Sequence, residues 1–176
     1  MKEQIIDAVR KAFSKLIEED GYLFDCPIEE GFEYDARKLH EVCINHKFAY
    51  YLEKFILPII ERGNVKYFVD IEFNKEGINK KEIKIAGEER VVRPDIIIHN
   101  RKTGDEKDNV LVVECKKVGA PDKELQDDEE KIIAFIENEK YSYQFGLQVI
   151  YGKDIIKGTL FYPADGEISR QKINFC

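Results

Sequence analysis

The sequence has no long hydrophobic run. Its longest apolar stretches, near residues 94–100 and 111–115, fall far short of the roughly 20 residues that a membrane-spanning helix requires. The N-terminal segment mixes charged with apolar side chains and contains no small-residue cleavage site, so it does not resemble a secretory signal. We therefore expect no membrane span and a cytoplasmic protein.

Paired cysteines are also lacking. Cys26, Cys43, Cys115 and Cys176 are scattered, with no C-x-x-C pair and no nearby histidine at a spacing typical of zinc sites. We expect these cysteines to be reduced and mostly buried thiols.

An excess of basic residues is absent as well. The net charge is −7 and the isoelectric point is near 5.2. This is unfavourable for a nucleic-acid partner, because lysine and arginine supply most of the non-specific affinity for phosphate. The argument weakens if the acidic run Asp127–Glu130 lies away from the functional site, and if divalent cations offset other clustered carboxylates.

The sequence shows no internal repeat and no low-complexity segment. With 176 residues and 43% hydrophobic content, the chain has the size of one compact domain and leaves little room for a second. We expect a single domain over residues 1–176, made of an N-terminal helix and loop (1–38), a core (39–152) and C-terminal strands (153–176).

Hydrophobic spacing predicts the order of the elements. Apolar residues recur every three or four positions in three segments, which is the pattern of amphipathic helices. These segments are 2–19, 39–57 (ending before Pro58) and 122–138. Alternating or continuous apolar runs predict strands over 66–74, 94–100, 110–117, 144–152 and 158–164, with a hairpin over 81–92. Together they predict an α/β fold with a mixed central sheet flanked by helices.

The clearest chemical signal lies on two neighbouring predicted strands. Asp95 opens one strand, and Glu114-Cys115-Lys116 closes the next one, with Glu114 19 residues after Asp95. Because side chains alternate along a strand, Glu114 and Lys116 point the same way, about 7 Å apart, while Cys115 faces the other side. If the two strands pair antiparallel, Asp95 comes to lie beside Glu114.

Two converging carboxylates repel each other, and burial beside an apolar sheet raises the cost of keeping both ionised. A divalent cation removes this conflict, and magnesium suits a site of one or two carboxylates with water and a substrate phosphate. Lys116 offers a compact positive charge that can polarise an attacking water or stabilise charge developing on the phosphate. The predicted chemistry is hydrolysis of a phosphodiester by metal-activated water.

These residues resemble a known family. The segments RPDIIIHN and NVLVVECKK look like the motif of the PD-(D/E)XK nuclease superfamily, and the resemblance covers roughly residues 39–152. It implies a restriction-endonuclease-like core with the layout α-β-β-β-α-β. It also implies that Asp95 and Glu114 bind magnesium, for which manganese can substitute, and that Lys116 assists hydrolysis.

The resemblance adds further candidate residues. Glu41 matches a helix glutamate that often serves as another metal ligand, and the backbone carbonyl of Cys115 completes the expected metal-binding set. Some bacterial and phage members carry a tyrosine and a glutamine just after the second core helix, similar to the segment YSYQFG here. The expected substrate-binding residues are Tyr143, Gln144, Lys47 and Lys117.

Simpler explanations exist for several of these residues. Pro-Asp is most often a turn, and an acidic residue such as Glu41 is favoured in the first turn of any helix by the helix macrodipole. Asp70 and Glu72 share a predicted strand face and stay outside the expected site, because solvent-exposed strand faces often carry such pairs. The pairing of Asp95 with Glu114 favours function over a turn.

The leading hypothesis is a magnesium-dependent endonuclease acting on DNA. The alternatives are a nucleic-acid-binding or assembly module that keeps the nuclease fold without cutting, and a nuclease acting on RNA, since the metal site does not distinguish the sugars. If both strands of a duplex are cut, a homodimer with one site per strand is the natural arrangement.

Overall fold

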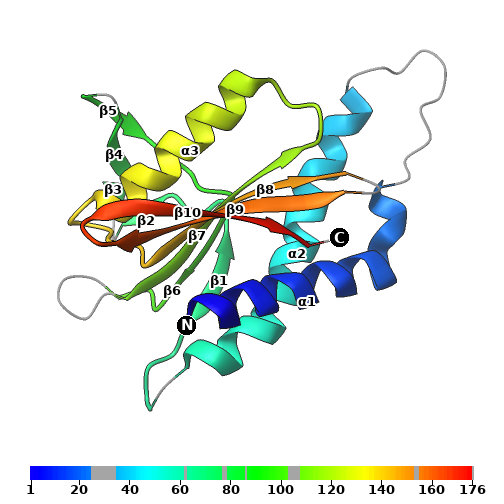
Figure 1. Cartoon of the computed structure of the whole chain (residues 1–176), viewed down its shortest axis with the longest axis horizontal. Helices are drawn as coiled ribbons and strands as arrows, with labels where there is room; N and C mark the ends of the chain where they lie inside the picture. Colours follow the sequence, from blue (N-terminus) through cyan, green and yellow to red (C-terminus); the bar gives the residue numbers. More distant parts are fainter. Residues whose placement is uncertain are drawn as a thin grey trace.

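A computed structural model of the protein describes residues 1–24, 35–61, 63–76, 79–85, 87–102, 108–152 and 155–175; for residues 35–40, 76 and 79 it describes the backbone alone. Within this part of the chain, a mixed sheet forms the centre. Helices α1 and α2 cover one face of the sheet and α3 covers the other (Figure 1).

Six described strands form the sheet, in the order β1-β6-β7-β8-β9-β10. Their bounds are β1 Phe68–Ile71, β6 Ile96–His99, β7 Asn109–Lys117, β8 Phe145–Tyr151, β9 Ile156–Ala164 and β10 Glu167–Asn174. β7 and β8 are parallel and are connected through α3, whereas the other neighbouring pairs of described strands are antiparallel. The predicted α/β class, with a mixed sheet flanked by helices, is confirmed.

The three predicted helices are present with small differences at their ends. Their bounds are α1 Lys2–Asp20, α2 Asp35–Ile60 and α3 Asp122–Glu137, and a short 3-10 helix, η1, spans Gly21–Phe24. The helix α2 begins four residues before the predicted start at Leu39 and continues past Pro58. Pro58 removes one N–H donor, but Ile56 and Ile60 are buried against the core and favour one more helical turn.

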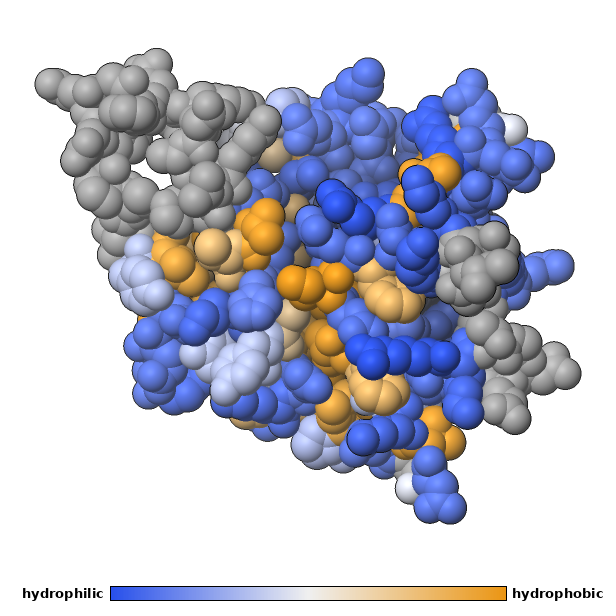
Figure 2. Space-filling model, turned by 180° about the vertical axis from the view of Figure 1, so that it is seen from behind, coloured by the Kyte–Doolittle hydropathy of each residue, from blue (hydrophilic) through white to orange (hydrophobic). Residues whose placement is uncertain are grey.

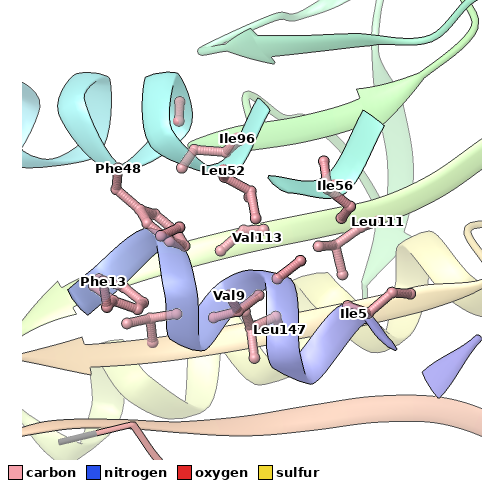
Figure 3. Close-up of a cluster of buried hydrophobic side chains, with 14 of the residues drawn as sticks. Ile5, Val9, Phe13, Phe48, Leu52, Ile56, Ile96, Leu111, Val113 and Leu147 are labelled. Carbon is pink, nitrogen blue, oxygen red and sulfur yellow. The ribbon is translucent and has the colours of Figure 1, made fainter. Parts of the chain in front are cut away.

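The larger core lies between the sheet and the pair α1 and α2. Side chains that follow the helical period point into it from both helices, and Phe13 stacks on Phe48 with ring centroids 4.0 Å apart. Figure 3 shows this cluster, which includes Ile5, Val9, Phe13, Phe48, Leu52, Ile56, Ile96, Leu111, Val113 and Leu147. Burying each such side chain stabilises the fold by about 1.5–3 kcal/mol relative to leaving it exposed.

A second core lies on the opposite face, under α3. Ile132, Phe135 and Ile136 of α3 pack on the sheet and on the hairpin of β4 (Glu82–Ile85) and β5 (Glu88–Val91). This hairpin was predicted over 81–92, but it pairs only with itself and stays outside the central sheet. Another hairpin, β2 (Lys75–Glu76) with β3 (Asn79–Lys80), was not predicted, because two-residue strands are too short to show a period.

β1 is shorter than the predicted strand over 66–74. It ends at Ile71 because Glu72 adopts a positive φ of 48°, outside the strand region, while the Glu72 N–H donates to the carbonyl of Asp95 at 2.9 Å. Glu72 therefore leaves the strand, and the predicted alternation of faces holds only up to Ile71. The geometry instead ties the end of β1 to the start of β6.

The surface is mostly hydrophilic with hydrophobic patches between, as Figure 2 shows for the face opposite to that of Figure 1. None of the helices in the described ranges is long and apolar enough to cross a membrane. Cys115 is buried as expected, but Cys43 is exposed because it lies on the outer side of α2. Cys26 and Cys176 lie outside the described residues.

Candidate active site

The predicted pair of strands brings Asp95 and Glu114 together. β6 and β7 are antiparallel, with Ile96 paired to Val113, so Asp95 precedes β6 at the position beside Glu114. The backbone N–H of Cys115 donates to Asp95 Oδ2 at 2.7 Å, which fixes the carboxylate of Asp95 against β7. The antiparallel pairing on which the sequence argument depended is confirmed.

The side chains of β7 alternate between its two faces as expected. The side chain of Cys115 is fully buried in the core under α1 and α2, while Glu114 and Lys116 face α3. Burial raises the pKa of the Cys115 thiol well above its usual value, and the nearby Asp95 carboxylate raises it further. The Cys115 thiol is therefore protonated and unreactive, and only its backbone remains a candidate ligand.

Glu114 carries the most unusual environment of the site. Its side chain is 2% exposed, and Oε2 lies 2.6 Å from the Nζ of Lys131. The other oxygen, Oε1, is buried and has no hydrogen-bond partner among the described residues. Burial raises the pKa of Glu114 well above its usual value; the Lys131 charge opposes this shift, and Asp95 and Asp128 add to it. An unsatisfied buried oxygen costs about 1–3 kcal/mol, so this arrangement calls for a functional reason.

Asp128 and Lys131 of α3 lie beside Glu114 and Lys116, so the condition that the acidic run 127–130 lies away from the site is not met. Asp128 is 5% exposed. Its Oδ1 lies 3.5 Å from Lys131 Nζ, and its Oδ2 lies 3.4 Å from Lys116 Nζ. The signal was present in the helical period: Asp128 stands four residues before the buried Ile132 and continues its stripe toward the sheet.

Both lysines keep their charge in this environment. Burial lowers the pKa of Lys116, but Asp128, Asp95 and Glu41 outweigh it, so the pKa is raised. Burial lowers the pKa of Lys131 in the same way, and Glu114 and Asp128 more than offset it. Burial also raises the pKa of Asp95, although the hydrogen bond from the Cys115 N–H opposes this rise. The site thus holds alternating positive and negative charges.

Glu41 approaches the site from α2. It lines a cavity of about 310 Å³ together with Asn45, Glu72 and Asp95. Burial raises the pKa of Glu41, and the nearby charges of Lys116 and Lys117 oppose the shift. Because α2 begins at Asp35, Glu41 does not lie in the first turn, and the helix macrodipole does not explain its presence.

Tyr151 holds this part of α2 in place. Its hydroxyl donates to Asn45 Oδ1 at 3.1 Å, and Tyr151 pairs with Lys117 in the register of β7 and β8. The end of β8 is thereby tied to the turn of α2 that carries Glu41. Lys117, predicted to bind substrate, lies at this end of the sheet.

Three of the predicted substrate-binding residues do not join the site. Gln148, and not Gln144, pairs with Glu114, so Gln144 lies about 13 Å away along β8. Gln144 Nε2 donates to Asp108 Oδ1 at 2.7 Å, and Tyr143 is buried with its hydroxyl accepting from Lys81 Nζ at 3.3 Å. The reason is that β8 runs parallel to β7, so its beginning lies at the far end of the sheet.

Lys47 is also directed elsewhere. Its Nζ forms an ion pair with Asp20 Oδ1 at 3.1 Å, which joins α2 to the end of α1. The glutamine that lies beside Glu114 is Gln148 and not the predicted Gln144. Gln148 is 8% exposed, and its Nε2 donates to the carbonyl of Leu125 at 2.6 Å. Gln148 thus ties α3 to β8 beside Glu114.

The donor chemistry of the site fits a magnesium ion held by two carboxylates. Among the side chains that the structure describes, no group of three or more His, Cys, Asp or Glu residues is arranged to hold a metal ion. Asp95 and Glu114 provide carboxylate oxygens, and Glu114 Oε1 has no other partner among the described residues. Magnesium takes few protein ligands and keeps several waters, so the chemistry of two carboxylates is compatible with this ion.

Comparison of the chain with protein-family models, with curated proteins and with solved structures gave no significant match.

Proposed function

We propose that this chain is a magnesium-dependent phosphodiesterase of the PD-(D/E)XK type that cuts DNA. The observation that carries the proposal is the carboxylate of Glu114, which is almost fully buried and has one oxygen without a hydrogen-bond partner among the described residues. Asp95 and Lys116 lie beside it. A fold accepts such a group where function requires it.

The order of elements supports this proposal. The succession α2, β1, β6, β7, α3 and β8, with β7 parallel to β8, is compatible with the α-β-β-β-α-β order expected for that superfamily. The small hairpins between β1 and β6 are additions to this layout, and α1, β9 and β10 extend it on either side.

Each residue of the site has a role in the proposed reaction. Asp95 and Glu114 hold magnesium, with Glu41 and the Cys115 carbonyl as supporting donors, and manganese can replace magnesium. The ion supplies a Lewis acid that offsets negative charge on the phosphate. Lys116 remains protonated, so it presents a point charge to the phosphate oxygens and orients the attacking water. Lys117 contributes further positive charge at the same end of the sheet.

The first test is cleavage of linear and circular DNA, of single and double strands, and of RNA, with magnesium, manganese or chelator. We expect cutting that requires the metal and falls roughly 100-fold or more in Glu114→Gln and Lys116→Ala. The matched controls are Asp165→Asn and Lys123→Ala, at exposed positions, which should cut like the wild type. Cutting that survives chelation, or that Glu114→Gln retains, would contradict the proposal.

A second function is favoured by one feature of the site. Lys131 Nζ already lies 2.6 Å from Glu114 Oε2 and occupies one oxygen of this carboxylate, which suits a nucleic-acid-binding or assembly module that keeps the fold without cutting. In that case no substrate is cleaved, although the protein binds DNA or RNA and slows its migration in a gel-shift assay. Glu114→Gln and Lys116→Ala then leave that binding largely intact.

A further inference from the structure

The position of Lys131 raises a question about the proposed metal site. Its Nζ lies 2.6 Å from Glu114 Oε2, on one of the two carboxylates that would hold magnesium. Lys131 is itself largely buried, with a side chain that is 20% exposed. A divalent cation on Glu114 would therefore be placed beside a positive charge that water screens poorly.

Four charges form a continuous chain along the inner side of α3. Lys131 Nζ is 2.6 Å from Glu114 and 3.5 Å from Asp128 Oδ1, and Lys116 Nζ is 3.4 Å from Asp128 Oδ2. Lys131 and Asp128 are three residues apart on the same helix, so their side chains are neighbours whatever happens at Glu114. Lys131 therefore has a second carboxylate within reach when it leaves the first.

We infer that Lys131 is a built-in counter-cation of Glu114 that a divalent metal ion must displace, and that Asp128 receives the displaced amine. This inference rests on the proposed function, because it takes Glu114 as a metal ligand. It gives α3 a role in the site that the nuclease motif on β6 and β7 does not contain. The affinity for metal is then set by the exchange of Lys131 between two carboxylates.

The contacts of Asp128 support the receiving role. Its side chain is 7% exposed, and Oδ2 has no hydrogen-bond partner among the described residues, although Lys116 Nζ lies 3.4 Å away. Asp128 thus has unused capacity to accept hydrogen bonds. An ammonium group carries three donors and turns easily between two acceptors, so the exchange needs only a change of rotamer.

The test is isothermal titration of the whole chain with Mn²⁺ in the absence of nucleic acid. Lys131→Met removes the charge at similar length, and Lys131→Gln keeps a donor for Glu114 should the methionine variant fail to fold. Both variants should bind Mn²⁺ at least about 10-fold more tightly than the wild type. Lys123→Met removes an exposed charge from the same helix and should change the affinity less than about 2-fold.

The role of Asp128 is tested by a double-mutant cycle. If Asp128 receives the amine, Asp128→Asn weakens Mn²⁺ binding more in the presence of Lys131 than in the Lys131→Gln background. If Asp128 acts only through its charge, the two effects are equal. An additive cycle therefore overturns the receiving role.

The possible failures are distinguishable. If the wild type binds Mn²⁺ and the folded Lys131→Met and Lys131→Gln variants bind it with unchanged or weaker affinity, the displacement of Lys131 is overturned and the proposed function stands. Absence of Mn²⁺ binding by the wild type and by both variants overturns the proposed metal-dependent function, and the inference falls with it.

Discussion

The buried carboxylate of Glu114 and the partly buried carboxylate of Asp70 have opposite electrostatic environments. Burial raises the pKa of Glu114 well above its usual value, and one lysine only partly compensates. Burial would also raise the pKa of Asp70, but hydrogen bonds from His99 and Arg101 outweigh it and hold that pKa well below its usual value. The His99 Nε2 to Asp70 Oδ2 distance is 2.8 Å, and Arg101 donates to both oxygens. Asp70 therefore stabilises the fold in its ionised form.

This lowered pKa predicts how stability depends on pH. A carboxyl with a lower pKa in the folded state stabilises the fold above its unfolded value, here 3.8, and loses the contribution as the pH falls below it. Asp70→Asn should lower the free energy of unfolding by about 2 kcal/mol at neutral pH. The difference from the wild type should shrink in acid, as urea unfolding at roughly pH 7 and pH 3 will show.

The matched control is Asp7→Asn. Asp7 forms an exposed ion pair with Arg10 at 2.8 Å, so its loss should change the free energy of unfolding by less than about 0.5 kcal/mol. If Asp70→Asn destabilises equally at both pH values, the contribution of Asp70 comes from packing and not from its charge.

At the scale of elements, the close packing of α3 on β8 determines which residues form the site. Gly146 lies under this helix, and a Cβ there would meet Ile132 Cγ2 at 2.2 Å and Ile136 Cδ1 at 3.2 Å. The absence of a side chain allows the helix to approach closely. Asp128 is one helical turn before Ile132, so the same approach brings Asp128 and Lys131 to Glu114.

Gly146→Ala tests this close packing of α3 on β8. We expect the substitution to lift α3 or force Ile132 from its rotamer, and to lower the free energy of unfolding by about 2 kcal/mol. Gly21→Ala is the matched control, because Gly21 has a φ of −56° and nothing lies within 4 Å of the added Cβ. Urea unfolding of both variants gives the comparison, and equal stability of the two would show that α3 does not require the close approach.

At the scale of the whole molecule, the proposed ion couples to folding. An ion that binds only the folded chain stabilises it by about 3 kcal/mol at a hundredfold excess over its Kd. For a chain of this size that corresponds to a rise in Tm of roughly 5–10 °C. We expect magnesium to raise the Tm of the wild type by this amount in differential scanning calorimetry.

Two controls separate site binding from general screening of the net charge of −7. Sodium chloride at equal ionic strength should give a much smaller rise in Tm. Glu114→Gln should abolish the magnesium-dependent rise. Equal rises in Glu114→Gln and in the wild type would mean that magnesium acts on the acidic surface and not at this site.

The sequence by itself determined the features that depend on short-range pattern. Helical spacing located α1, α2 and α3 to within a few residues, and strand alternation placed Glu114 and Lys116 on one face of β7 with Cys115 on the other. The antiparallel pairing of two strands that are consecutive in the predicted order brought Asp95 beside Glu114. These features follow from backbone geometry over one strand pair or one helix.

Only the tertiary structure decided what reaches the site from distant elements. The parallel register of β7 and β8 selects Gln148 and not Gln144, because it depends on how α3 crosses the sheet. The close packing of α3 over Gly146 brings Asp128 and Lys131 to Glu114. The end of β1 at Glu72 shapes the cavity that Glu41 lines. A helical period shows that Asp128 faces the sheet, but it does not encode which distant residue Asp128 meets there, because that depends on side-chain packing between elements far apart in sequence.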